Sequence, residues 1–178
     1  MPHTVLVLGG TGLIGRLILS TFLAKGHPVV AYSRNISKLP PELSTKYPTT
    51  FVPVQGSLDN ESELKAALTI RPVTVVVSSV GPVDGRGHEV GSIARGYRVL
   101  AKTMKEPGVR TVYALAAIVG MVGALIPAAK AELIEIAKTF NEGNTFEGLD
   151  WVVYLFGMLK DGEPTTVEAQ EARLALRG

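Results

Sequence analysis

The fold is decided by the stretch Thr4-Val5-Leu6-Val7-Leu8-Gly9-Gly10-Thr11-Gly12-Leu13-Ile14-Gly15. The run Thr4–Leu8 predicts a strand, and the pattern from Leu13 to Lys25 predicts a helix directly after it, with Leu13, Leu17 and Phe22 among the residues expected on its buried face. Three glycines lie at the junction: we expect Gly9 to allow the tight turn, Gly12 to leave the backbone open to a ligand, and Gly15 to let the helix pack closely on the sheet. The helix N-terminus then offers unpaired N–H groups and a positive dipole end to an anion.

The rest of the chain alternates short apolar runs with longer helical patterns. Strands are predicted at Thr4–Leu8, Val29–Ser33, Thr50–Val54, Val73–Ser78, Arg110–Ala117 and Leu149–Phe156. Helices are predicted at Leu13–Lys25, Asn60–Leu68, Glu89–Lys105 and Ala128–Asn141, with a short one opening at Thr165 and loop or broken helix over residues 35–47. This alternation predicts an α/β, doubly wound parallel sheet of about six strands in the order 3-2-1-4-5-6, a single three-layer domain of Rossmann type.

Composition narrows the class of protein. The 178 residues suit one domain, and 46% hydrophobic residues are enough for a substantial core. The net charge of +2 provides no strong field for nucleic acid or an anionic membrane. The lack of cysteine excludes disulfides and thiolate chemistry, and the scattered His3, His27 and His88 predict no metal site. The start lacks the pattern of a signal peptide, so we expect a cytoplasmic protein.

One uncharged stretch, Val112–Ala129, is nearly long enough to span a bilayer. Glycines and Pro127 interrupt it, and no basic flanks frame it on both sides. We therefore expect a strand buried on both faces, followed by an apolar loop at Gly120–Ile126. That loop is predicted to form either an apolar floor of the substrate site or a buried support for the next helix.

The end of the second predicted strand, Ser33-Arg34, predicts the cofactor. An NAD site usually has an Asp or Glu here for the ribose 2′-hydroxyl, and this chain has none. The guanidinium of Arg34, helped by Asn35 or Lys38, suits a 2′-phosphate instead. The alternative is that Arg34 is a solvated surface residue.

These motifs together resemble the atypical short-chain dehydrogenase/reductase proteins, in the NAD(P)H-binding branch that includes NmrA-like proteins and small flavin/biliverdin reductases. The resemblance rests on Gly9–Gly15, Ser33-Arg34, Gly56–Asp59, Ser78–Gly81 and Leu149–Val153. It implies an NAD(P)H cofactor, for which Ser33-Arg34 favours NADP(H), with Ser57 and Leu58 flanking the adenine, and with Ser79, Val80 and Gly81 lining the ribose and nicotinamide side. The predicted cofactor-binding residues are Gly9, Thr11, Gly12, Leu13, Ile14, Gly15, Ser33, Arg34, Ser57, Leu58, Ser79, Val80 and Gly81.

The chain departs from this family at its catalytic positions. The Tyr-x-x-x-Lys pair of larger members is absent, and the nearest segment, Ile126–Lys130, has Ile where the proton-donating Tyr would be. Lys130 is therefore a candidate for holding ribose or substrate, or a solvated helix residue. The loop Asp84–Glu89 is the other candidate region for acid–base chemistry, through His88 or Asp84, and its alternative is an ordinary polar loop that caps the next helix. Tyr97 and Tyr113 are expected to pack in the core.

Three functions follow from these residues. The first is an NADPH-dependent reductase of a small apolar substrate, with a reduced C-terminal substrate lobe in a single domain over residues 1–178. The second is a non-redox cyclase, isomerase or dehydratase on the same scaffold, favoured by the missing Tyr. The third is a cofactor-sensing protein of the NmrA-like kind. A second subunit in a homodimer could complete the open substrate pocket.

Overall fold

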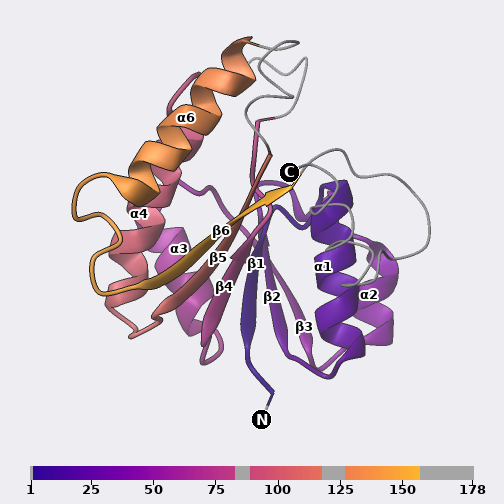
Figure 1. Ribbon diagram of the computed structural model, residues 1–178. Coiled ribbons are helices and arrows are strands. Elements are labelled where there is room, and N and C mark those ends of the chain that lie inside the picture. Colours follow the sequence, from indigo (N-terminus) through magenta and orange to yellow (C-terminus); the bar gives the residue numbers. More distant parts are fainter. Residues whose placement is uncertain (1, 83–88, 118–126, 157–178) are drawn as a thin grey trace, which may run out of the picture.

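The computed structural model describes residues 2–82, 89–117 and 127–156, and these form one sheet of six parallel strands (Figure 1). The strand order is β3-β2-β1-β4-β5-β6. The strands are β1 (Val5–Leu8), β2 (Val29–Ser33), β3 (Phe51–Gln55), β4 (Val75–Ser78), β5 (Thr111–Ala117) and β6 (Asp150–Phe156). The predicted Rossmann-type order is confirmed, and the chain reverses its direction of travel across the sheet between β1 and β4.

Helices cover both faces of the sheet. They are α1 (Leu13–Ala24), α2 (Pro41–Lys46), α3 (Glu61–Thr69), α4 (Ser92–Lys105) and α6 (Pro127–Asn141), with a short 3-10 helix η1 (Ile36–Lys38). Figure 1 shows α1 and α2 on one face and α3, α4 and α6 on the other. The predicted ends hold to within a few residues, and the expected broken helix over residues 35–47 is η1 followed by α2.

The core forms two layers, one on each face of the sheet, and β1 contributes side chains to both. Leu6 and Leu8 belong to the larger cluster under α3, α4 and α6, whereas Val5 and Val7 belong to the smaller cluster under α1 and α2. All four are at most 1% exposed. A strand covered on both sides reads as an unbroken apolar run, and β1 accordingly shows no polar alternation.

The buried face of α1 differs from the prediction. We expected Leu13 and Leu17 on that face, but their side chains are 78% and 61% exposed. The helix instead faces the sheet with Gly15, Leu19 and Leu23, which recur every four residues. The close approach of Gly15 to the turn after β1 fixes this rotation of the helix. The predicted start of α4 was also early, since Val90 lies before the helix and is 42% exposed.

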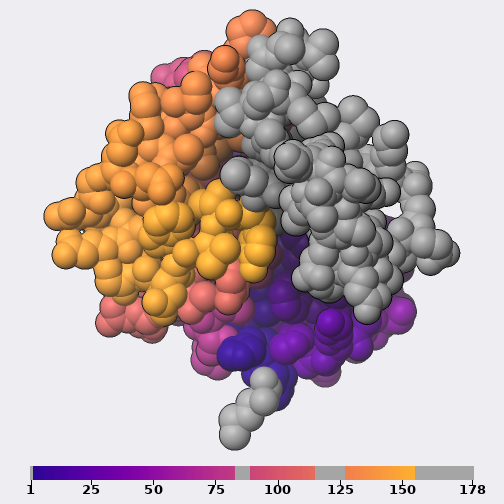
Figure 2. Space-filling view, in the orientation of Figure 1, coloured from indigo at the N-terminus to yellow at the C-terminus, as the bar shows by residue number. Residues whose placement is uncertain are grey.

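The uncharged stretch beginning at Val112 is confirmed as a strand over its first six residues, which belong to β5. Of the helices in the described ranges, none has the length and apolar character needed to cross a membrane. β6 is the edge strand, and its atoms lie on the surface in Figure 2. The predictions for Asp84, His88, Gly120–Ile126 and the helix opening at Thr165 lie outside the described residues.

Candidate nucleotide-binding site

The predicted site residues meet at one edge of the sheet. The glycine turn follows β1, Ser33 ends β2, Ser57 and Leu58 follow β3, and Ser79–Gly81 follows β4. These four strands are neighbours in the order β3-β2-β1-β4 and run parallel, so their carboxyl ends lie side by side (Figure 1). The fold therefore places every described residue of the predicted cofactor set along this edge.

Glycines bring the turn after β1 into contact with two other segments. Gly9 has φ +79°, a left-handed conformation that favours glycine. A Cβ on Gly9 would lie 2.8 Å from the Ser79 hydroxyl oxygen, and one on Gly15 would lie 2.1 Å from the Gly9 carbonyl oxygen. The Gly12 amide also donates to that carbonyl at 3.0 Å. Packing inside the protein thus accounts for Gly9 and Gly15.

Gly12 is different because its packing against the described residues does not require glycine. It is the N-cap of α1, and a Cβ there would meet only the Gly9 carbonyl oxygen at 3.5 Å, an ordinary contact. No side chain of the described residues caps this helix, and its first turn carries no acid. Among the described atoms none accepts a hydrogen bond from the amides of Leu13, Ile14 or Gly15. The absent Cβ therefore leaves space directly in front of three available N–H groups.

Two other helices on this edge begin with their amides already bound. The Asn60 side chain caps α3 by accepting from the Glu63 amide at 3.2 Å. The carboxylate of Glu132, on α6, accepts from amides in the first turn of α4, including those of Ile93 and Ala94 at 2.9 and 3.0 Å. Of these three helices, only α1 presents an uncapped N-terminus to an anion.

The turn after β3 is held by a tyrosine and a glutamate. The Tyr32 hydroxyl donates to the Ser57 carbonyl at 2.8 Å, and the Ser57 amide donates to the Glu63 carboxylate at 2.9 Å. Burial, with the nearby charges of Glu63 and Asp59, raises the Tyr32 pKa, so this hydroxyl stays a donor. Sequence reasoning missed both contacts.

Leu58 is fixed from the other side by α4. A Cβ on Gly96 of that helix would lie 2.6 Å from the Leu58 Cγ, so only glycine lets the helix approach this closely. Leu58 packs against the larger core cluster as a partly buried residue. Leu58, which is predicted to flank the adenine, is thus held in place by α4, a helix that begins more than thirty residues later in the chain.

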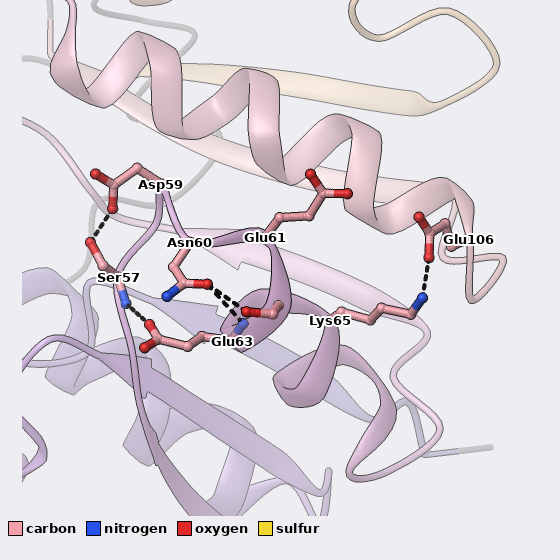
Figure 3. A pocket seen from close by; sticks show the side chains of 8 residues that line it. Ser57, Asp59, Asn60, Glu61, Glu63, Lys65 and Glu106 are labelled. Atoms are coloured by element: carbon pink, nitrogen blue, oxygen red, sulfur yellow. Dashed lines mark hydrogen bonds and ion pairs between the residues drawn. The ribbon is translucent and has the colours of Figure 1, made fainter.

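An open cavity of about 730 Å³ lies beside this turn, and four of its eight lining residues are acidic (Figure 3). The lining residues are Ser57, Asp59, Asn60, Glu61, Ser62, Glu63, Lys65 and Glu106. Lys65 is paired with Glu106. Glu61 is paired with Lys102 in the same way, which leaves Asp59 and Glu63 as the lining acids outside these two ion pairs. Two such carboxylates make this cavity a poor place for a phosphate group.

The turn after β4 is held by Tyr97 of α4. Its hydroxyl lies 2.7 Å from the Ser78 hydroxyl, which also accepts from the Val80 amide at 3.3 Å. The Ser79 hydroxyl donates to the Leu8 carbonyl at 3.2 Å and so ties the turn to β1. Burial raises the Tyr97 pKa to about 12, with the Ser78 bond acting in the opposite direction. Tyr97 is fully buried, which confirms core packing, and its hydroxyl also positions the predicted ribose and nicotinamide side.

Replacing Tyr97 by Phe is expected to lower the free energy of unfolding by about 1–2 kcal/mol, because the buried Ser78 hydroxyl loses the shorter of its two hydrogen bonds. Urea denaturation followed by circular dichroism measures this change. Tyr113→Phe is the matched control, since the Tyr113 hydroxyl has no hydrogen-bond partner among the described residues. Equal losses in the two variants would show that the Ser78 contact contributes nothing.

Arg34 is exposed directly after β2, and its charge acts on Asp59 in the turn after β3. The Asp59 pKa is lowered first by the Ser57 hydroxyl, and the charges of Arg95 and Arg34 add to this effect. The Arg16 guanidinium on α1 donates to the Lys38 carbonyl at 3.1 Å, which ties the segment after Arg34 to α1. Arg34 thus follows β2 at the same edge of the sheet as Gly12, and the segment after it is tied to α1.

Lys130 lies on α6 with an exposed side chain, while Asp84 and His88 lie outside the described residues. At the amino edge of the sheet, the His3 amide donates to the His27 ring at 3.0 Å. No group of three or more potential metal ligands occurs in the part of the chain that the structure describes.

Comparison with known proteins agrees with this geometry. Residues 9–178 match the family described as NAD(P)H-binding. Pinoresinol reductase 2 of Arabidopsis thaliana is 37% identical over 91 residues, 48% of this chain and 28% of that protein. The dTDP-6-deoxy-L-talose 4-dehydrogenase (NAD(P)(+)) of Kitasatospora kifunensis is 37% identical over 92 residues, 49% of this chain and 27% of that protein. The matches therefore span little more than a quarter of the length of these two relatives.

Solved structures share the fold. A short-chain dehydrogenase/reductase from Veillonella parvula, in complex with NADP, superposes with a TM-score of 0.65 at 19% identity, covering 86% of this chain and 68% of that one. The enzyme WbmH of Bordetella bronchiseptica, in complex with NAD+, gives a TM-score of 0.68 at 14% identity, covering 98% and 64%. One neighbour holds NADP and the other NAD+, so the likeness of fold does not select between the two.

Proposed function

The chain belongs to the NAD(P)H-binding family, and from that premise we propose that it binds NADPH and reduces a small apolar carbonyl substrate. The observation that carries the proposal is the N-terminus of α1. Its amides at Leu13, Ile14 and Gly15 have no acceptor among the described residues, and the missing Cβ of Gly12 leaves room before them. A pyrophosphate supplies the acceptors and the negative charge that such a helix end favours.

The preference for NADPH over NADH is assigned to Arg34. Its guanidinium follows β2, where an NAD site would have an acid for the ribose 2′-hydroxyl. A 2′-phosphate gives this cation two or more charge-assisted hydrogen bonds. Lys38 follows it by four residues, and Ser33 precedes it, so both can contribute to the same pocket.

The remaining residues of the site orient the cofactor. Leu58 packs beside the adenine, and Ser79, Val80 and Gly81 line the passage toward the nicotinamide. When bound, NADPH supplies the hydride for the carbonyl carbon of the substrate, whose oxygen takes up a proton. Ile126 has no proton to give at the position of the usual Tyr. Asp84 and His88 are therefore proposed as proton donors, and Lys130 is proposed to hold the ribose or the substrate.

Titration calorimetry and thermal unfolding with NADPH and NADH test the binding step. NADPH at one hundred times its dissociation constant is expected to add about 2.7 kcal/mol of stability. NADH is expected to bind more weakly. If neither nucleotide binds, the proposal fails.

Loss of NADPH absorbance in the presence of small apolar carbonyl compounds tests the chemical step. A rate that falls on substitution of Asp84, His88 or Lys130 supports the assigned roles. Tight NADPH binding without oxidation across such a panel would instead favour a nucleotide-sensing protein.

A further inference from the structure

Glu132 of α6 is the one charged residue with no solvent exposure among those the structure describes. Its carboxylate accepts hydrogen bonds from the Gly91, Ile93 and Ala94 amides at the start of α4. The remaining amide of that turn, on Ser92, donates to the Glu89 carbonyl at 3.0 Å. All four of these amides at the N-terminus of α4 therefore have a hydrogen-bond acceptor, and for three of them the acceptor is the Glu132 side chain on another helix.

This arrangement replaces a cap that α4 cannot form for itself. Its N-cap residue is Gly91, which has φ +87° and no side chain to accept a hydrogen bond. Burying an ionised carboxylate is costly unless hydrogen bonds and an opposing charge compensate. Three amides and the positive end of the α4 dipole supply that compensation for Glu132.

The first turn of α4 leads directly to the residues that hold the candidate site. Gly96 and Tyr97 lie within one helical turn of Ala94. Gly96 admits Leu58, and Tyr97 bonds Ser78 at the exit of β4.

The same two helices meet again about two turns along α6. There the ring of Phe140 packs edge-on to Tyr97, with 5.1 Å between their centroids. Any shift of the α4 start relative to α6 must therefore move both turns that line the predicted adenosine and nicotinamide sides.

We propose that Glu132 is a positioning residue for nucleotide binding, which couples α6 to the carboxyl ends of β3 and β4 through the first turn of α4. The inference rests on the proposed function, because it takes the nucleotide to lie along those ends. By linkage, a nucleotide that favours the locked position of α4 must also strengthen the Glu132 contacts.

Hydrogen exchange on the unsubstituted protein tests this coupling directly. Saturation with NADPH is expected to slow exchange of the Gly91, Ile93 and Ala94 amides by about tenfold, which corresponds to about 1.4 kcal/mol. Binding of NADPH without any change at these amides overturns this inference and leaves the proposed function standing. Absence of binding by NADPH and NADH alike overturns both.

Substitution supplies the second test. Glu132→Gln keeps one oxygen acceptor but turns an NH₂ group toward the amides, so NADPH affinity is expected to fall by about tenfold. Glu135→Gln is the matched control, since Glu135 lies on the same helix in a surface ion pair with Lys138. Affinities are measured at a temperature where each variant is fully folded, so a purely structural role would leave them equal.

A double-mutant cycle that combines Glu132→Gln with Tyr97→Phe tests whether Glu132 affects nucleotide binding through Tyr97 of α4. If Glu132 acts through α4, the losses of NADPH affinity in the two single variants are expected not to add in the double variant. Additive losses overturn the route through Tyr97. Should Glu132→Gln not fold, the exchange experiment on the unsubstituted protein decides the question alone.

Discussion

A Gly15→Ala variant is expected to lose at least about 3 kcal/mol of unfolding free energy, a large part of the total stability of a domain this size. The new Cβ would lie 2.1 Å from the Gly9 carbonyl oxygen and within 2.8 Å of two further backbone atoms. Backbone cannot rotate away as a side chain can, so the turn after β1 or the start of α1 must move. The intrinsic gain of about 1 kcal/mol for alanine over glycine in a helix is too small to offset this.

The matched control is Gly12→Ala, the same change three residues earlier. Its Cβ meets one atom at 3.5 Å, so the cost is expected to stay near or below about 1 kcal/mol, mostly because alanine is a poorer N-cap than glycine. NADPH binding is nevertheless expected to weaken by tenfold or more, roughly 1.4 kcal/mol, because the methyl group occupies the space before the α1 amides. Urea denaturation and calorimetry separate the two effects. Equal destabilisation by both substitutions would contradict the assigned roles.

The strands and helices could be predicted because their determinants are local in sequence: apolar runs of strand length alternate with helical patterns. The sheet order followed from this alternation together with the glycine turn after the first strand, which is typical of the Rossmann fold. The glycine spacing also indicates which face of α1 is buried, because Gly15 must face the turn after β1. Hydrophobicity alone does not identify this face, because Leu13 and Leu17 are apolar and yet exposed.

The contacts that fix the site could not be predicted, because they join distant segments. The Tyr32 hydroxyl reaches Ser57, and the Tyr97 hydroxyl reaches Ser78, through sheet and helix packing that no local pattern encodes. Tyr97 was expected to pack in the core, and Tyr32 lies inside the predicted strand Val29–Ser33, so neither pattern indicated a contact with the site. Glu132 did leave a signal: it lies in phase with the buried stripe of α6, which includes Ala129, Leu133, Ile136 and Phe140. An acid on such a stripe must have a buried partner.

The proposed preference for NADPH rests on the charge of Arg34, and an Arg34→Ala variant tests it. NADPH affinity is expected to fall by about 10- to 100-fold, the value of one or two charge-assisted hydrogen bonds to phosphate. NADH affinity is expected to change little, because that cofactor has no 2′-phosphate. The salt dependence of NADPH binding is also expected to weaken, since one exposed ion pair is removed.

Arg110→Ala is the control for this loss of charge. Arg110 precedes β5 at the amino edge of the sheet, where it donates to the Gly148 carbonyl at 3.0 Å. A general effect of net charge on an anionic ligand would lower NADPH affinity in both variants alike, whereas a phosphate contact lowers it only in Arg34→Ala. An equal drop for NADPH and NADH in Arg34→Ala would place the guanidinium on a group that both nucleotides carry, such as the pyrophosphate, because the two differ only in the 2′-phosphate.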